Sequence, residues 1–245
     1  MRFKIISSLL IILLSSLTGE AQKGITTFGF CVRPSFPSRF FRTGPIDFSD
    51  STINYSIVQQ SGLSFGGLVR HGITNRLSLE TGIIYTKRNY DLSLRDTTFT
   101  GRGNFSIVGY EVPVSFLVFI QLDPRFWMDV GLGGSVDIYP SDVYTDDAYY
   151  AHYGAREQKV NGGVSANLGF EWRTKSYGYF YLGFIYHRAF SPIYTSIVEY
   201  YPDRDFSKPY TSIGRTQLQG DYFGIDLKYF FHEDPEKKQK KKSNR

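Results

Sequence analysis

The sequence predicts an all-β fold, an eight-stranded antiparallel up-and-down barrel that spans a membrane, and three observations support this prediction. Aromatic residues make up 17% of the 245 residues and there are 24 glycines. After the first 21 residues, no apolar run approaches the ~20 residues that a membrane-spanning helix needs. Apolar side chains alternate instead with polar or glycine positions in eight segments, and the connections between these segments are alternately short and long.

The first residues have the features of a secretory signal peptide. Arg2 and Lys4 precede an apolar run, and Gly19-Glu20-Ala21 follows it as a small-x-small cleavage site. The run is shorter than the ~20 residues of a spanning helix, so we expect it to be removed. The chain is therefore expected to have three parts: a signal peptide at 1–21, a barrel domain at 22–231 and a disordered basic tail at 232–245.

Period-2 alternation is clearest in residues 160–173, where Val164, Leu168 and Phe170 share one face and Asn167 and Glu171 share the other. The same pattern, in places weaker, predicts eight strands: Ile25–Arg33, Ile57–His71, Arg76–Arg88, Phe105–Leu122, Phe126–Tyr139, Val160–Arg173, Tyr177–Phe190 and Phe223–Phe231. Pro113 has no amide donor for a strand ladder, so the fourth strand is expected to contain a local bulge there.

The connections alternate in length. Three are tight, at Gly72–Asn75, Asp123–Arg125 and Thr174–Ser176, and four are long, at Pro34–Ser56, Asp91–Asn104, Pro140–Lys159 and Ser191–Arg215. Bacterial outer-membrane barrels have short periplasmic turns and long extracellular loops. The pattern therefore predicts a Gram-negative outer-membrane protein, with both termini in the periplasm because the strand number is even.

One face of the predicted strands carries most of the charged residues. A soluble barrel would turn this face outward, whereas a membrane barrel turns it into the lumen and presents the apolar face to lipid. Rings at two levels of the apolar face, such as Trp172 and Tyr229 near the short turns and Tyr85 and Tyr110 near the long loops, match interfacial girdles. We expect a lumenal polar network of ion pairs, with a proton or ion path as the alternative. Its members are Glu80, Arg88, Glu111, Asp129, Glu171, Arg173, His187, Asp226 and Lys228.

Two short motifs carry a resemblance to a known family. The segment TGIIYTKRNY followed by YEVPVSFLV resembles strands of PorT-like outer-membrane β-barrel proteins of Bacteroidota, and the matching residues are Gly82, Tyr85, Lys87, Glu111 and Pro113. The resemblance implies an outer-membrane barrel and, through the namesake of the family, a role accessory to type IX secretion.

The end of the last strand resembles the signal that the barrel assembly machinery reads. Gly224, Leu227, Tyr229 and Phe231 stand in Gly-x-x-hydrophobic-x-aromatic-x-aromatic order. This resemblance implies the assembly machinery and outer-membrane lipid as partners. In this chain the motif is followed by fourteen further residues, whereas such signals are usually C-terminal.

The remaining function classes are weighed from composition. The net charge is +5, but six positive charges lie in the last nine residues, so nucleic-acid binding is not expected. Asp142, Asp146, Asp147 and His152 lack the spacing of a calcium loop, and we expect a solvated, tyrosine-rich loop with no metal or cofactor.

We expect a non-enzymatic structural or binding role, with a protein or glycan partner at the long loops, which combine aromatic residues with arginine. The alternative is an outer-membrane lipid-modifying enzyme, a lipid A acyltransferase or deacylase. His187 and Ser191 form the one near pair at a strand end that such an enzyme could use. His187 lies on the lumenal face by parity, so a structural histidine is the preferred interpretation.

Overall fold

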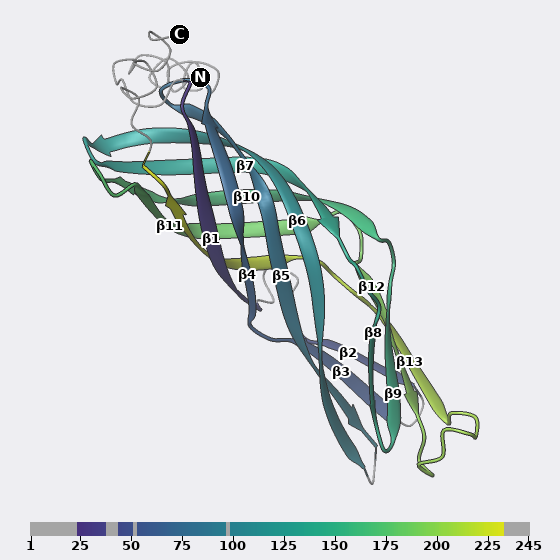
Figure 1. Cartoon of the computed structure of the whole chain (residues 1–245). Helices are drawn as coiled ribbons and strands as arrows, with labels where there is room; N and C mark the ends of the chain where they lie inside the picture. The colour runs from purple at the N-terminus through teal and green to yellow at the C-terminus, as the bar shows by residue number, and fades with distance from the viewer. Residues whose placement is uncertain (1–23, 38–43, 51–52, 97–98, 233–245) are drawn as a thin grey trace, which may run out of the picture.

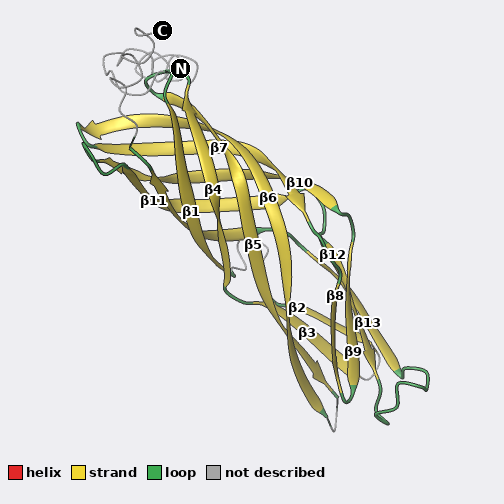
Figure 2. Cartoon of the chain, viewed as in Figure 1, coloured by secondary structure: helices red, strands yellow, loops and turns green. Residues whose placement is uncertain are grey.

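The computed structural model describes residues 24–232, with gaps at 38–43, 51–52 and 97–98. The predicted signal peptide at 1–21 and residues 233–245 of the predicted tail lie outside the described residues. Within the described part, the chain consists of strands, turns and connections, and Figure 2 shows no helix there. No helix in that part is therefore long and apolar enough to cross a membrane.

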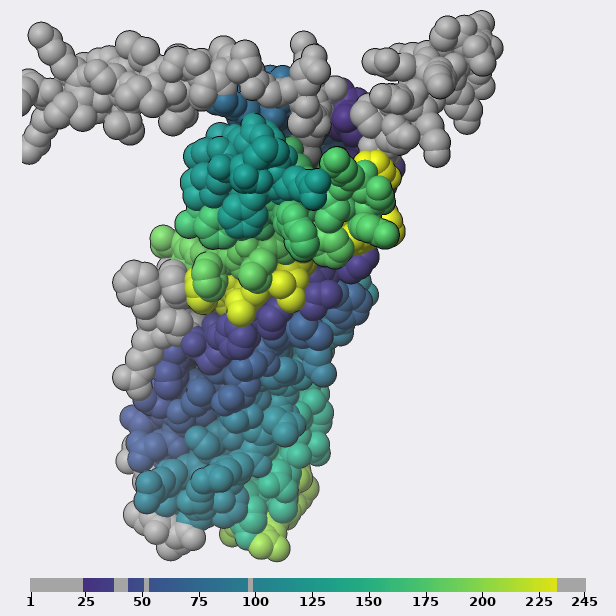
Figure 3. All heavy atoms as spheres, turned by 90° about the vertical axis from the view of Figure 1, so that its left-hand side faces the viewer, coloured from purple at the N-terminus to yellow at the C-terminus, as the bar shows by residue number. Residues whose placement is uncertain are grey.

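Eight of the described strands close into a barrel. Each strand is antiparallel to the next one around the barrel, and the last pairs with the first. In order around the barrel they are β1 (Thr26–Phe36), β4 (Gly62–Gly72), β5 (Leu77–Arg95), β6 (Thr100–Asp123), β7 (Phe126–Ile138), β10 (Val160–Arg173), β11 (Tyr179–Ala189) and β14 (Tyr222–Phe230). In Figure 3 the yellow strand β14 lies against the purple strand β1, which is the closing pair. The predicted fold class is confirmed.

Six further strands extend the barrel at one end. They are β2 (Ile46–Asp50), β3 (Ile53–Gln59), β8 (Val143–Asp147), β9 (Tyr150–Arg156), β12 (Tyr194–Tyr200) and β13 (Ser212–Leu218). The β2–β3 hairpin pairs with the distal part of β5, and β8, β9, β12 and β13 form a second sheet. Figure 1 shows these strands opposite the end where β1 begins and β14 finishes. We call this unit, with residues 89–95 of β5 and 100–108 of β6, the head.

The prediction that four connections are long loops is wrong. Large parts of Pro34–Ser56, Asp91–Asn104, Pro140–Lys159 and Ser191–Arg215 are paired strands. The two sheets of the head also contact each other at both edges, because β8 lies against β6 and β13 lies against β2. The head is thus a continuation of the barrel and not a set of loops.

The strand β5 shows how the two parts differ. In the barrel its outward residues are mainly apolar, as at Leu79 and Ile83, and its inward residues are mainly polar, as at Glu80, with Ile84 as the apolar exception. Beyond Arg88 the same inward face carries the fully buried Leu92 and Leu94, while outward positions carry charged or polar side chains. One strand therefore has a lipid-facing pattern at one end and the pattern of a water-soluble protein at the other.

Strand β6 changes at the same level. Its outward face is apolar from Tyr110 through Phe116, and its inward face becomes apolar at Ile107 and Phe105. Tyr85 pairs with Tyr110 across the two strands, and their ring centroids lie 5.9 Å apart. These rings mark the edge of the lipid-facing surface that is nearest the head, where aromatic side chains are favoured.

The expected bulge at Pro113 is wrong. The register between β5 and β6 is the same on both sides of Pro113, and Pro113 pairs with Ser135 of β7 without a shift. The carbonyl of Pro113 accepts a hydrogen bond of 2.8 Å from Thr81 Oγ1. The register shift of β6 lies instead between Gln121 and Asp123, next to a tight turn, where an extra residue disturbs few neighbours.

Candidate functional site

The structure places all nine residues of the predicted lumenal network inside the barrel, where each is at most 8% exposed. The charged side chains lie in two layers, a lower layer next to the tight turns and an upper layer nearer the head. Arg70 lies at the centre of the lower layer. Its Nη2 donates to Glu80 Oε2 at 3.0 Å, and its Nη1 donates to Glu171 Oε2. Glu171 Oε1 accepts a second bond, of 2.6 Å, from Arg173 Nε, while Lys228 Nζ lies 2.5 Å from Glu80 Oε1. Each carboxylate in this layer therefore has two cationic partners.

These ion pairs cross the lumen. Arg70 is on β4 and Glu171 is on β10, which are opposite one another in the eight-strand order. The guanidinium of Arg70 also stacks on the Phe230 ring, with Cζ 3.8 Å from the centroid. An eight-stranded barrel has an interior that side chains just fill, and here most of the charged side chains that fill it form ion pairs.

Arg33 connects the lower layer to an upper one. Its Nε donates to Asp226 Oδ1 at 2.8 Å, and its Nη1 lies 3.8 Å from Glu111 Oε1. The other oxygen of Glu111 accepts a bond of 2.8 Å from the hydroxyl of Tyr222. Asp226 Oδ2 also lies 3.3 Å from Lys228 Nζ.

Two predicted members have no ion-pair partner among the described residues. Asp129 accepts a hydrogen bond of 3.1 Å from Asn167 Nδ2, and Arg88 donates to the carbonyl of Gly220 at 3.1 Å. Conversely, the sequence analysis missed Arg33 and Arg70, which hold the two layers together. Parity could have found both, since Arg33 shares a face with Cys31 and Arg70 shares one with Ser64.

His187 lies in the upper layer and is fully buried. Its Nε2 is 2.9 Å from Ser135 Oγ and 3.2 Å from Asp137 Oδ2, and its Nδ1 is 3.3 Å from the carbonyl of Gly220. The pair of His187 and Ser191 that the lipid-modifying alternative could use does not form, and Ser191 Oγ donates instead to Asn161 Oδ1 at 3.0 Å.

The donor atoms of Glu111, Asp137 and His187 lie within 4.8 Å of one another. A cavity of about 10 Å³ lies beside them, lined in part by Glu111, Asp137 and Arg88. This is space for about one water molecule.

The head has a hydrophobic core of its own. Buried apolar side chains from several strands meet there, among them Ile57, Leu92, Ile107, Tyr150 and Val198. The expectation of a solvated, tyrosine-rich loop at residues 140–159 is therefore wrong, since Tyr150 is 1% exposed. Packing of this kind holds the head in one shape, as in a soluble β-protein.

His152, on β9, is also buried in the head. Its Nε2 lies 2.8 Å from Ser196 Oγ, and its ring centroid lies 4.3 Å from that of Phe105. Burial lowers the pKa of His152 from 6.5 to about 4, because a charged imidazole would lose its hydration here. His152 is therefore a neutral core residue at neutral pH.

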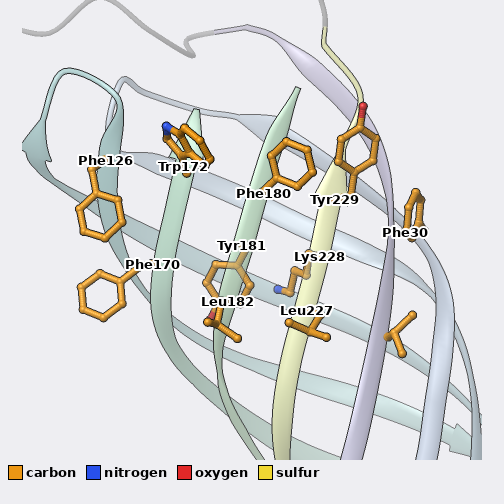
Figure 4. A pocket seen from close by; sticks show the side chains of 11 residues that line it. Phe30, Phe126, Phe170, Trp172, Phe180, Tyr181, Leu182, Leu227, Lys228 and Tyr229 are labelled. Atoms are coloured by element: carbon orange, nitrogen blue, oxygen red, sulfur yellow. The ribbon is translucent and has the colours of Figure 1, made fainter. Parts of the chain in front are cut away.

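The lipid-facing belt consists of the outward apolar side chains of the barrel. Across five neighbouring strands the register aligns Phe126, Trp172, Phe180, Tyr229 and Phe30 in one row. Figure 4 shows these rings on the outer surface, at the edge of an open apolar groove of about 910 Å³. The row is positioned as an aromatic girdle at the edge of the belt that carries the tight turns.

The residues of the predicted assembly signal lie on β14 and directly after it. Leu227 and Phe231 are exposed on the outer surface, at 42% and 52%, and Tyr229 belongs to the girdle. Gly224 is buried at the contact with β1, where a Cβ atom would lie 2.5 Å from the carbonyl oxygen of Pro34.

Comparison with known proteins gives the fold. No family model matches the chain, and no curated protein matches it. The structure is similar to that of the outer membrane protein OprG from Pseudomonas aeruginosa, with a TM-score of 0.55 and 11% identity over 86% of this chain and 98% of that one. The fold is that of an outer-membrane β-barrel.

A second solved structure is more distant. The outer membrane protease OmpT from Escherichia coli aligns with a TM-score of 0.34 and 8% identity, over 85% of this chain and 94% of that one. At such values the alignment supports no conclusion about activity.

Proposed function

We propose that this chain is a non-enzymatic protein of the Gram-negative outer membrane that presents a rigid β-head at the cell surface for binding a protein or glycan. In this proposal the tight turns and both termini lie in the periplasm. The observation that carries it is the exchange of faces along β5 and β6, where the lipid-facing pattern ends at Tyr85 and Tyr110 and a soluble pattern begins.

The lumen supports a structural role for the barrel. Ion pairs link opposite strands through its centre, and breaking them to open a diffusion path would leave buried charges without partners. We therefore assign the lumenal network to stability and not to transport. The head, in contrast, offers an ordered surface, which lowers the entropic cost of binding a partner.

Exposed aromatic side chains on the head give the binding proposal a specific surface. Tyr144 and Tyr153 pair across β8 and β9 and are 63% and 42% exposed. Exposed tyrosines are enriched at the centres of protein interfaces and also stack on sugars, so these two are the residues to test first. On the PorT-like resemblance, we propose that the protein is accessory to type IX secretion and that the partner at the head belongs to this pathway.

The test compares two variants that carry the same kind of substitution. In vivo cross-linking from residue 146 on β8, which is exposed on the same face as Tyr144, followed by purification from intact outer membranes, would be done with wild type, Tyr144→Ser/Tyr153→Ser and Tyr177→Ser. Tyr177 is 76% exposed at the opposite end of the barrel and is the matched control. We expect a discrete cross-linked species that the double variant loses and the control retains. If no species forms, or the double variant retains it, the binding proposal is wrong.

The lipid-modifying alternative has weaker geometry. Ser135 and Asp137 both face the same nitrogen of His187, whereas a nucleophilic serine and an orienting acid need opposite nitrogens. His187 is also enclosed in the lumen, away from the lipid-facing belt. A lipid A profile that changes on deletion of the gene and again in a His187→Ala variant would revive this alternative.

A further inference from the structure

We propose that Glu111, Asp137 and His187 form a binding site for one first-row divalent transition-metal ion, of which Zn²⁺ is the reference case. The three side chains come from β6, β7 and β11, so the ion would tie together strands that are not all neighbours. One nitrogen and two carboxylate oxygens are a ligand set that such ions bind. All three residues are buried, and their donor atoms already lie within 4.8 Å of one another.

The hydrogen bonds of His187 prepare Nε2 as a ligand. A carbonyl oxygen only accepts, so the contact of 3.3 Å with Gly220 requires the proton on Nδ1. In the neutral ring this leaves the lone pair of Nε2 directed toward Ser135 and Asp137. In most metal sites, a histidine that binds the metal through one ring nitrogen donates a hydrogen bond from the other nitrogen to a carbonyl or carboxylate.

The neighbouring carboxylates have oxygens that are held by ionic contacts alone. Both oxygens of Asp137 and Oε1 of Glu111 are buried and accept no hydrogen bond of normal geometry among the described residues, and Glu111 Oε1 lies 3.8 Å from Arg33 Nη1. Asp137 Oδ2 lies 3.2 Å from His187 Nε2. Ligand atoms bound tetrahedrally at about 2.1 Å from one ion lie roughly 3.4 Å apart, so this pair is already spaced for a shared ion. With a neutral histidine and no ion, the lone pairs of Nε2 and Asp137 Oδ2 face each other, and the Ser135 hydroxyl, 2.9 Å from Nε2, is a hydrogen-bond donor beside them.

Two arginines decide the kind of ion. Arg88 lines the same cavity without an ion pair to either carboxylate among the described residues, and Arg33 lies 3.8 Å from Glu111. Their positive charge disfavours ions that are held mainly by charge, such as Mg²⁺ and Ca²⁺. A transition-metal ion gains a bond to the imidazole nitrogen and is less affected. A proton on Nε2, which would make an imidazolium and Asp137 ion pair, is the competing occupant.

The experiment uses the full-length mature protein, purified without a polyhistidine tag and refolded into detergent with Zn²⁺, Mg²⁺ or no added metal. Metal content is measured after gel filtration, and folding is checked by heat-modifiable gel migration. The variants are His187→Gln and Asp137→Asn. His71→Gln is the matched control, because His71 is exposed on the barrel and reports zinc bound adventitiously at the surface.

We expect about one zinc ion per folded wild-type chain, no retained Mg²⁺, and zinc content reduced at least about 10-fold in His187→Gln and Asp137→Asn. The His71→Gln control should retain zinc. If folded wild-type protein retains no zinc, the imidazolium ion pair occupies the site and the proposal is wrong. Equal zinc retention in folded His187→Gln would also overturn it. Should His187→Gln fail to fold, the nearly isosteric Asp137→Asn variant decides between these outcomes.

Discussion

The substitution Arg70→Met removes the residue that links opposite walls of the lumen. Arg70 donates hydrogen bonds to Glu80 and Glu171 and stacks on Phe230. Methionine retains part of the apolar contact but removes the positive charge that lies between two buried carboxylates. Removal of one partner from a buried ion pair costs about 3–5 kcal/mol.

The structure places this variant toward the lower end of that range. After the substitution, Glu171 still has Arg173 at 2.6 Å and Glu80 still has Lys228 at 2.5 Å, so neither carboxylate loses all its partners. We therefore expect a loss of about 3 kcal/mol in the free energy of unfolding. Adding Glu171→Gln to Arg70→Met should recover part of this loss, with a coupling energy of about 0.5–3 kcal/mol between the two positions.

The assay is equilibrium urea unfolding of the barrel in lipid vesicles, followed by tryptophan fluorescence and heat-modifiable gel migration. Arg102→Met is the control, because Arg102 is exposed on the head. We expect the control to lie within about 0.5 kcal/mol of wild type. If Arg70→Met is as stable as the control, the lumenal network does not hold the barrel together and the reasoning is refuted.

Two further outcomes follow from close packing and from burial. Gly183→Ala should destabilise the barrel by about 1–3 kcal/mol in the same assay, because its Cβ would lie 2.2 Å from the hydroxyl of Tyr181. Gly67→Ala, with no atom within 4 Å of its Cβ, should have little effect, and equal losses would contradict the packing. The pKa of His152 is about 4 in the folded head and 6.5 when the residue is exposed. As pH falls from 6.5 to about 4, this residue therefore binds a proton in the unfolded state only, which favours unfolding. Protease resistance of the head should decline over this window, with a loss of at most about 3 kcal/mol, and His152→Asn should remove the decline. A decline that persists in His152→Asn would assign the effect to another group.

The barrel could be predicted from the sequence because lipid and a filled lumen impose opposite demands on the two faces of each strand. Residues 160–173 alternate without interruption, and the predicted and observed limits of β10 agree. The weaker strands were still found, but their inward arginines were not assigned. Arg33 stands at the end of its predicted segment, and Arg70 stands in a segment that the structure divides into β3 and β4.

The head could not be predicted by the same rule. On β5, the apolar residues up to Tyr85 occupy odd positions with the exception of the buried Ile84, and those from Tyr90 onward occupy even positions. A search for one apolar face therefore ends at the edge of the lipid-facing belt, although the strand continues. The change of parity is itself readable in the sequence, and it marks the level where the surroundings of the barrel change from lipid to water. The Glu111, Asp137 and His187 cluster needed coordinates, because it depends on the register of three separate strands.

Cysteine accessibility along β5 tests this exchange of faces most directly. The chain has one native cysteine, Cys31, which is buried and would be replaced by serine. Single cysteines at Ile83, Leu92 and Ser93 would be labelled with a membrane-impermeant maleimide on intact cells. With the head at the cell surface, as we propose, rapid labelling is expected at Ser93 only, because Ile83 faces lipid and Leu92 lies in the core of the head. Rapid labelling at Leu92, or equal labelling at Ile83 and Ser93, would contradict the exchange of faces.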